Sequence, residues 1–417
     1  MTVARAPGTV VQVEIQSIAA GGDGVGRADG LVVFVPRTAP GDRAQVRIRQ
    51  EHRFARGELD ALLQPSSLRA SPPCAHYRLD RCGGCQLQHM RYEAQLRAKS
   101  GIVLDALQRI GKRPIEPPTV RPSERQWRYR RKLTLAMRRL TTRWTMGLRP
   151  YDDPSALFQL EDCPITDERV VATWQEIMRA EQSLPQHPEL RGSVRLGAGG
   201  TTVIIEGGRD WRMSDRFFAA VPSAAVLWWK PDQGARRLIA ERPGAEASAT
   251  ASFGQVNADV AAALHGHVVE RARAYAPAVV VDAYAGTGET AVPLAVSGVR
   301  VTAIELDRDA VARCASRMPK SSQAIAGRVE DVLPSALPAD VVMLNPPRAG
   351  LHERVPEILT RQVPRPRAIL YVSCNPATLA RDLTRLAAYR IASVVCFDMF
   401  PQTAHVETVC ELVPEAS

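Results

Sequence analysis

Alternation of apolar and polar residues dominates the first part of the chain. Residues 10–18, 30–36 and 44–49 each alternate in this way or form a short apolar run, as strands with one buried face do. Glycines gather between residues 21 and 26, and such clusters are typical of turns. Short strands spaced about ten residues apart predict a small β-barrel over residues 1–64.

The pattern changes twice further along the chain. Residues 65–73 contain proline and small polar residues without periodicity, so we expect a linker there. Apolar residues at helical spacing predict a helix over residues 90–110, ended by Gly111. Residues 65–250 mix both kinds of pattern, and we expect them to form a central domain.

From residue 251 onward, apolar strand patterns alternate with helical patterns. Four short runs predict strands, at residues 278–282, 299–304, 340–344 and 368–372. Such alternation predicts a parallel, doubly wound sheet of the Rossmann-like type over residues 251–417. The expected fold class is therefore multidomain α/β, with a small barrel, a mixed central domain and a C-terminal Rossmann-like domain.

Composition limits the class of protein and the compartment that we expect. The 417 residues include 54 Lys and Arg against 44 Asp and Glu, a formal net charge of +10, and 45% are hydrophobic. This composition is typical of globular proteins. The sequence contains no run of about 18 apolar residues and no signal-peptide pattern. We therefore expect a cytoplasmic monomer that makes no contact with a membrane.

The positive charge is concentrated in one stretch. Residues 121–149 hold ten Lys and Arg residues against one acid, Glu124, and include two tryptophans and a tyrosine. Basic strands with interleaved aromatic residues are typical of surfaces that contact phosphates and stack bases. The pattern favours contact with RNA or DNA through Arg130, Arg131 and Lys132. A solvated amphipathic hairpin is the alternative.

A glycine turn follows the first strand of the C-terminal domain. Gly286 and Gly288 allow a tight turn and the close approach of a ligand to the backbone. Glu305 lies 19 residues after Gly286, where an acid can bind ribose hydroxyls, so a dinucleotide stays an open possibility. Asp282 suits the ammonium of an amino-acid moiety, which favours S-adenosylmethionine. A tight turn without a ligand is the alternative.

The third strand of this domain also ends in candidate chemistry. Asn345, Pro346 and Pro347 follow the strand at residues 340–344, as in methyltransferases that act on exocyclic amino groups. In those enzymes an aromatic residue comes next, whereas this chain has Arg348. A methyltransferase acting on the amino group of adenine is thus an alternative that the missing aromatic residue weakens.

The fourth strand is followed by Cys374, whose thiol would face the same cleft. Addition of a thiolate to carbon 6 of uracil would make carbon 5 nucleophilic toward an activated methyl group. A base must then remove the proton from carbon 5, and Glu407, with His405 nearby, is a candidate. Each residue alone also has a plainer interpretation, as a buried structural cysteine and a solvated carboxylate.

Together these motifs resemble those of one family. Residues 19–26, Cys82-Gly-Gly-Cys85, Ser373-Cys-Asn-Pro376 and residues 399–407 resemble the RNA uracil-5 methyltransferases. The resemblance covers nearly the whole chain and is to the 23S ribosomal RNA type, with a TRAM domain and an iron–sulfur cluster. It implies an RNA-binding TRAM barrel, with Cys374 as the nucleophile and Glu407 as the base.

The resemblance also implies the roles of the remaining candidates. S-adenosylmethionine would be the cofactor, contacted by Gln255, Tyr284, Gly286, Glu289, Glu305 and Asn345. Glu289 and Asn345 depart from the family pattern, which has asparagine and aspartate there. A [4Fe-4S] cluster would be held by Cys74, Cys82, Cys85 and Cys163, although the spacing of four thiolates suits zinc equally. Arg348 is expected to orient the uracil or a phosphate.

The resemblance favours one RNA target over another. The TRAM domain and the set of four cysteines favour 23S rRNA, and a transfer-RNA uracil methyltransferase is the alternative. A non-catalytic RNA-binding protein, in which Asn345 marks a lost activity, is a further alternative of a different class.

Overall fold

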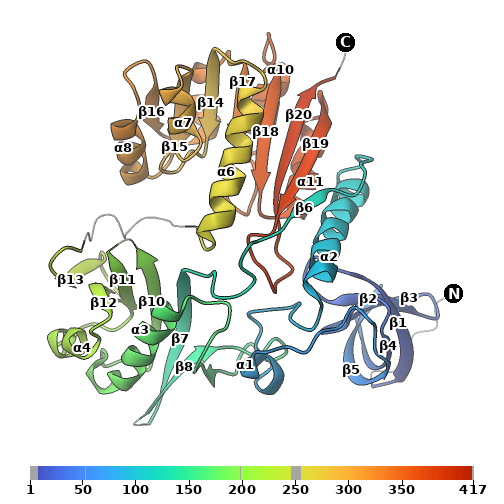
Figure 1. Ribbon diagram of the computed structural model, residues 1–417, viewed down its shortest axis with the longest axis vertical. Helices are drawn as coiled ribbons and strands as arrows, with labels where there is room; N and C mark the ends of the chain where they lie inside the picture. Colours follow the sequence, from blue (N-terminus) through green and yellow to red (C-terminus); the bar gives the residue numbers. More distant parts are fainter. Residues whose placement is uncertain (1–7, 52, 142, 198, 246–254, 416–417) are drawn as a thin grey trace.

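The computed structural model is drawn in Figure 1 and describes residues 8–51, 53–141, 143–197, 199–245 and 255–415. Three sheets organise these residues: a closed barrel, a seven-stranded sheet and an eight-stranded sheet. The barrel and the seven-stranded sheet lie at one end of the molecule, and the eight-stranded sheet lies at the other (Figure 1). No helix in the described residues is long and apolar enough to cross a membrane.

The barrel forms because alternating residues turn one apolar face inward. Its strands are β1 (Val10–Ile18), β2 (Gly24–Ala28), β3 (Leu31–Val35), β4 (Arg43–Glu51) and β5 (Phe54–Gln64). They are bonded in the order β1-β2-β3-β5-β4 and close on themselves. Val13, Val33 and Val46 are among the buried side chains of the core. The predicted barrel and three of its strands are confirmed.

The strands β2 and β5 were not predicted. The turn expected at residues 21–26 is present at Gly21 and Gly22, whereas its later residues form the start of β2. Gly24 and Gly26 lie within β2. A Cβ atom at Gly24 would stand 2.1 Å from the Thr38 hydroxyl, and one at Gly26 would stand 2.3 Å from a methyl group of Val13. These glycines therefore mark the close approach of neighbouring backbone and side chains inside a narrow barrel.

A long helix follows the linker. Residues 65–73 lead to α1 (Ala75–Leu79), and the helix predicted at residues 90–110 is α2 (Tyr92–Asp105), continued by the π-turn η1 (Ala106–Ile110). Gly111 follows η1 directly, as predicted.

This helical stretch packs on the C-terminal sheet although it precedes the central sheet in the sequence. Val103 of α2 and Leu107 of η1 are completely buried in a core shared with that sheet. The short strand β6 (Thr119–Arg121) pairs in parallel with β19 (Tyr389–Phe397) at the edge of the sheet. Figure 1 shows α2 next to β6, between the barrel and the C-terminal sheet.

The central sheet is covered by helices on one face. Its order is β13-β12-β11-β10-β7-β8-β9, with β7 (Lys132–Leu140), β8 (Arg143–Leu148), β9 (Phe158–Gln159), β10 (Glu189–Gly197), β11 (Gly200–Glu206), β12 (Ala224–Lys230) and β13 (Arg237–Glu241). Trp174 of α3 (Glu168–Arg179) and Phe217 of α4 (Ser214–Ala220) are buried against it. The short helix η2 (Glu181–Ser183) follows α3. The basic strand β7 is thus an inner strand of this sheet.

The C-terminal sheet contains the four predicted strands in parallel. They are β14 (Val279–Ala283), β15 (Arg300–Glu305), β17 (Val341–Leu344) and β18 (Ala368–Ser373). Val280 packs into one core and Val281 into another, because successive side chains of a strand point to opposite faces. Helices form both cores: α6 (Ala258–Arg273), α7 (Ala291–Val296) and α8 (Arg308–Arg317) on one face, and α9 (Val329–Ala336), α10 (Arg354–Arg361) and α11 (Pro376–Arg385) on the other. The doubly wound fold is confirmed.

The sheet is not parallel throughout, unlike the prediction. The full order is β16-β15-β14-β17-β18-β20-β19-β6, with β16 (Gln323–Ala326) and β20 (Glu407–Pro414) as additional strands. β20 runs antiparallel to both β18 and β19. The hydrophobic pattern of a strand does not contain its direction, which depends here on the loop at residues 398–406. In Figure 1 this loop extends from the sheet toward α2.

Candidate active site

The glycine turn after β14 contacts the end of the neighbouring strand β15. The Gly286 N–H donates a hydrogen bond to the Glu305 carboxylate over 2.9 Å. The second carboxylate oxygen of Glu305 accepts from the N–H groups of Leu306 and Asp307, at 2.7 and 3.0 Å. The structure thus brings together the turn and the acid that lie 19 residues apart, at the point where the strand order reverses and such sheets bind ligands.

Two residues of this turn have constrained backbones. Gly288 has a φ of 89°, and a Cβ atom there would stand 2.5 Å from the Cys314 sulfur. Tyr284 has a φ of 65°, in the left-handed region that bulky residues rarely adopt. Such backbone strain clusters at functional sites, which agrees with a role for Tyr284 at the crevice.

The two acids beside the turn lie in different environments. Asp282 is buried and accepts a hydrogen bond from the Thr290 hydroxyl at 2.6 Å, and burial raises the pKa of this carboxyl to about 7. Glu289 instead forms a 2.9 Å ion pair with Arg317, which holds the pKa of Glu289 below its usual range. Glu289 is therefore already engaged by a charged partner.

The other two predicted cofactor residues are Asn345 and Gln255. Asn345 follows β17, and its N–H donates to the Ala283 carbonyl of β14 at 3.2 Å. Gln255 comes just before α6, and the carbonyl of the next residue, Val256, accepts from the Arg131 N–H at 3.0 Å. Gln255 is thus close in the chain to a contact between the central and C-terminal domains. Two residues of its motif lie outside the described residues, Phe253 and Gly254.

Cys374 and Glu407 lie close together at the ends of neighbouring strands. The ladder pairs Ser373 of β18 with Thr408 of β20, so Cys374 lies opposite Glu407. Burial raises the pKa of the Cys374 thiol, as does the charge of Glu407, whereas the Arg348 guanidinium lowers it. Burial also raises the pKa of the Glu407 carboxyl to about 7, against the opposing effect of Arg348. The two groups and Arg348 thus form one electrostatic unit.

The turn that carries Cys374 is fixed by a helix cap. Asn375 accepts a hydrogen bond from the Ala377 N–H at 3.1 Å and so caps α11. His405 is exposed, and its ring meets the Phe400 ring edge to face, with centroids 5.9 Å apart. A thiol, a carboxyl that titrates near neutrality and a guanidinium are suited to nucleophilic addition followed by proton removal.

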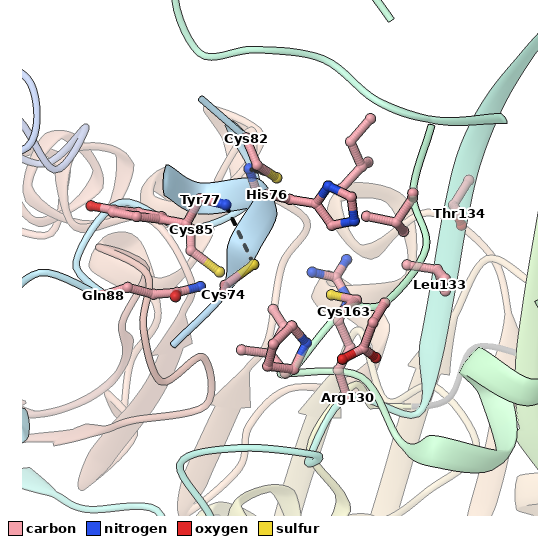
Figure 2. A pocket seen from close by; sticks show the side chains of 16 residues that line it. Cys74, His76, Tyr77, Cys82, Cys85, Gln88, Arg130, Leu133, Thr134 and Cys163 are labelled. Atoms are coloured by element: carbon pink, nitrogen blue, oxygen red, sulfur yellow. Dashed lines mark hydrogen bonds between the residues drawn. The ribbon is translucent and has the colours of Figure 1, made fainter. Parts of the chain in front are cut away.

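All four predicted ligand cysteines line one cavity of about 140 Å³ (Figure 2). Cys74, Cys82 and Cys85 come from the segment around α1, and Cys163 lies across the cavity beside Arg130. The Cys74 sulfur accepts from the Tyr77 N–H at 3.4 Å. Cys74, Cys82 and Cys85 are buried and Cys163 is half-buried, so the structure brings distant cysteines into one site.

The sulfurs surround the cavity and do not converge on one point. Among the residues that the structure describes, no three His, Cys, Asp or Glu side chains are placed to hold a metal ion. A tetrahedral zinc ion would draw its four sulfurs to within roughly 3.8 Å of one another. The described part of the chain thus gathers the four thiols at one cavity without arranging them as ligands of a single metal ion.

The basic residues at 121–149 make different kinds of contact. Three of its members form ion pairs inside the protein: Arg125 with Asp259, Arg128 with Asp162, and Arg138 with Glu189. Arg130 lines the cysteine cavity, and its Nε donates to the Lys132 carbonyl at 2.9 Å. Ion pairs within the protein therefore engage part of this basic stretch, although the side chains of Arg125, Arg128 and Arg138 stay partly exposed.

Two cations from β10 complete a basic group that the sequence did not indicate. Lys132 is paired with Arg195 in the β7–β10 ladder. Burial lowers the pKa of Lys132, and the charges of Arg195 and Arg191 lower it further. Arg195 lies 63 residues after Lys132, outside any basic run, and only the pairing of the strands brings the two together. Such a concentration of positive charge suits a polyanion.

Known protein families match both ends of the chain, and relatives match nearly all of it. Residues 4–59 match the TRAM domain family, and residues 322–413 match the tRNA (uracil-5-)-methyltransferase family. An uncharacterized RNA methyltransferase of Protochlamydia amoebophila is 32% identical, over 97% of this chain and 98% of its own length. Another, from Synechocystis, is 33% identical, over 98% of this chain and 96% of its own length.

A solved structure extends this similarity to the fold. The crystal structure of Pyrococcus abyssi tRNA (uracil-54, C5)-methyltransferase, in complex with S-adenosyl-L-homocysteine, is 25% identical with a TM-score of 0.70. The match covers 97% of this chain and all of the other. The expected TRAM barrel and methyltransferase fold are confirmed. This chain belongs to the family of S-adenosylmethionine-dependent RNA (uracil-5-)-methyltransferases.

Proposed function

We propose that this protein methylates carbon 5 of a uridine in RNA through a covalent bond between Cys374 and carbon 6 of the base. The observation that carries this proposal is the placement of Cys374 opposite Glu407, with Arg348 acting electrostatically on both. The reacting base must leave its stack to reach these side chains, as in other enzymes that modify bases.

Each of the three residues has one task in the reaction. The Cys374 thiolate, favoured by the Arg348 guanidinium, adds to carbon 6 and makes carbon 5 nucleophilic. S-adenosylmethionine supplies the methyl group that becomes bonded to carbon 5. Glu407 then removes the proton from carbon 5, the electron pair restores the double bond between carbons 5 and 6, and the thiolate leaves. A carboxyl with a pKa of about 7 is suited to accept that proton near neutral pH.

The proposed cofactor site is the crevice outside β14, β15 and β17. Glu305 would bind the ribose hydroxyls, and Gly286 leaves room for them, because a Cβ atom there would meet no other atom within 4 Å. Gln255, Tyr284 and Asn345 would line the rest of the site. A contact of Glu289 with the cofactor would require its ion pair with Arg317 to open.

The alternatives from other classes lose support. An adenine amino-group methyltransferase would use Asn345 and would not need a thiol opposite a carboxyl, and position 348 lacks the aromatic residue. A non-catalytic RNA-binding protein would need neither Cys374 nor Glu407 in this arrangement. Family membership and the paired side chains together favour the uracil-5 reaction.

We propose 23S rRNA as the substrate, bound by this protein as a cytoplasmic monomer. The support is the TRAM barrel, the four-cysteine cavity and the basic group of Lys132, Arg191 and Arg195, to which Arg131 is adjacent. Transfer RNA is the second candidate, because the structure with a TM-score of 0.70 is named as a tRNA (uracil-54, C5)-methyltransferase.

We also propose that Cys74, Cys82, Cys85 and Cys163 hold a [4Fe-4S] cluster, with zinc as the alternative. The support is the set of four thiols around one enclosed cavity. Methyl transfer moves no electrons between centres, so the cluster would act by holding the surrounding segments in place or by orienting the RNA.

The decisive test combines target and mechanism. Cells that lack this protein would be complemented with the wild type or with Cys374→Ala, and 5-methyluridine would be mapped in rRNA and tRNA by mass spectrometry. We expect 5-methyluridine to return to 23S rRNA with the wild type alone. Its return to tRNA would select the second candidate, and its return with Cys374→Ala would refute the covalent mechanism.

A reaction with purified protein and RNA tests the role of Glu407 as the general base. With S-adenosylmethionine present, Glu407→Gln should leave the methylated uridine bonded to Cys374, because the proton that permits elimination stays on carbon 5. A protein–RNA adduct on a denaturing gel is the expected result. No adduct from this variant would contradict the role of Glu407.

A further inference from the structure

The loop at residues 398–406 leads directly to Glu407 and is held by parts of the protein outside its own domain. We propose that Gln402 in this loop is a positioning residue, which the segment after Cys85 and Gln95 of α2 hold so that Glu407 stands correctly for proton removal. This inference rests on the role of Glu407 proposed above, and it assigns a task to an interdomain contact that the reaction itself does not use.

Gln402 has more hydrogen bonds than an ordinary loop residue. Its carbonyl accepts from the N–H groups of Gln86 and Leu87, at 3.1 and 2.9 Å. Its own N–H donates to Gln95 Oε1 at 3.0 Å, and its side-chain Oε1 accepts from Gln95 Nε2 at 2.9 Å. Gln402 is only 2% exposed and has a φ of 70°, a conformation that persists in a non-glycine residue only where the surroundings fix it.

The rest of the loop is held from the same side. Lys99 of α2 forms a buried ion pair with Asp398 and donates to the Phe400 carbonyl at 3.0 Å. The Tyr129 hydroxyl donates to the Pro401 carbonyl at 2.9 Å. A shift of the loop would leave buried charges without their partners, which is strongly unfavourable. The loop therefore has one well-defined position relative to α2.

Apolar packing adds the TRAM barrel to this junction. Ile18 of the barrel, Leu87, Ile102 of α2 and Ala404 of the loop share one small core. A Cβ atom at Gly22 of the barrel would stand 2.4 Å from the Gln86 Cβ. The barrel, the cysteine segment and α2 thus meet at the loop that precedes Glu407.

The order of the chemical steps predicts which step a displaced loop would slow. Glu407 acts only after the methyl group has been transferred, so a displaced loop should slow proton removal and leave the earlier steps intact. The methylated uridine would then stay bonded to Cys374 and accumulate as an adduct. A general loss of folding would instead reduce the activity and the adduct together.

Gln95→Met removes both bonds to Gln402, together with the bond from Gln95 Nε2 to the Met90 carbonyl, and keeps an unbranched side chain of similar length. We expect kcat to fall roughly 10- to 100-fold, the range for a misplaced catalytic group, with KM for RNA unchanged and adduct accumulating. Gln108→Met, at an exposed position of η1, is the matched control and should behave as the wild type.

Gln402→Gly distinguishes the contribution of the Gln402 side chain from that of its backbone. Glycine accepts the left-handed conformation, so this variant keeps the backbone bonds and loses the buried side chain with its amide contact; it should accumulate adduct to a smaller degree. Hydrogen exchange in the loop should also be faster in Gln95→Met than in the Gln108→Met control. These readouts keep the test valid if either variant proves poorly stable.

Three outcomes would overturn the inference: an unchanged kcat in Gln95→Met, loss of activity without adduct, or unchanged hydrogen exchange in the loop. Failure of the proposed function would look different. In that case Glu407→Gln itself would form no adduct. If Glu407→Gln forms the adduct and Gln95→Met does not, only the positioning role of Gln402 is wrong.

Discussion

Five of the eight cysteines occupy two contrasting settings in this molecule, and the other three are buried in the cores of the C-terminal domain. Cys374 lies at a strand end in a partly exposed position, under the opposing influences of Glu407 and Arg348. Cys82 and Cys85 are 8% exposed and line an enclosed cavity with the two other predicted ligands. Burial raises the pKa of the thiol in both settings.

The difference lies in what can reach the sulfur. At Cys374 one side is accessible, and a guanidinium favours the thiolate that a nucleophilic reaction needs. In the cavity the thiols have other thiols as neighbours, and their charges raise the pKa values of Cys82 and Cys85 further. A guanidinium acts on a thiol in both settings, because Arg37 lowers the pKa of Cys82 as Arg348 lowers that of Cys374. Neither burial nor a neighbouring cation therefore distinguishes the two settings, whereas access to the sulfur does.

The largest expected effect is on iron content, which depends on only one of the two settings if the proposed cluster is present. Cys85→Ser should lower the iron content per chain by roughly tenfold or more, because a ligand of the proposed cluster is lost, whereas Cys374→Ser should leave it unchanged. Iron and sulfide analysis with an absorption spectrum, on protein purified without oxygen, measures this. Equal iron content in the two variants would contradict the role of Cys85 as a cluster ligand. Zinc in place of iron in the wild-type protein would show that the site holds a single zinc ion.

A smaller effect is expected on the reactivity of Cys374. Arg348→Leu removes the charge that lowers the pKa of this thiol, so its alkylation by iodoacetamide at pH 7 should slow by up to about tenfold, the change for one pKa unit. The difference should shrink as the pH rises, because both thiols then become thiolates. Arg348→Lys keeps the charge and serves as the control. Equal alkylation rates in the wild type and Arg348→Leu would show that Arg348 does not act on Cys374.

Local patterns were enough to predict the features whose signal lies within a few residues. The alternation at residues 10–18 corresponds to β1, and the apolar run at residues 340–344 corresponds to β17. The spacing of Gly286 and Glu305 predicted an acid beside the glycine turn, and the structure places Glu305 there, because a strand–turn–helix–strand unit has a nearly fixed length. By contrast, a local pattern misled at Gly24, where close packing in the barrel takes the place of a turn.

Contacts between distant segments could not be predicted in the same way. Arg195 joins Lys132 through the register of two strands, and Gln95 meets Gln402 although 307 residues separate them. No hydrophobic period contains such partners, because they depend on the pairing of strands and the packing of domains. The same reason explains why the ion pairs of Arg125 and Arg128 with distant acids were missed.

The smallest expected effect concerns the support of the cysteine cavity. Arg37 of the barrel donates to the Tyr77 carbonyl and, at 3.3 Å, to the Cys82 carbonyl, and its guanidinium lies 4.0 Å from the centre of the Tyr77 ring. Arg37→Ala should lower the free energy of local opening around α1 by about 1–3 kcal/mol, the cost of leaving such carbonyls without a donor. Hydrogen exchange at residues 77–87 measures this.

The control for this prediction is Arg27→Ala, at an exposed position of the same barrel, which should change that free energy by less than about 0.5 kcal/mol. Because Arg37 contacts the cysteine segment and not the strand end of β18, exchange at residues 373–376 should stay as in the wild type. If Arg37→Ala speeds hydrogen exchange equally at residues 77–87 and 373–376, the two regions open together. The contrast between the two cysteine settings would then not be a property of their local surroundings.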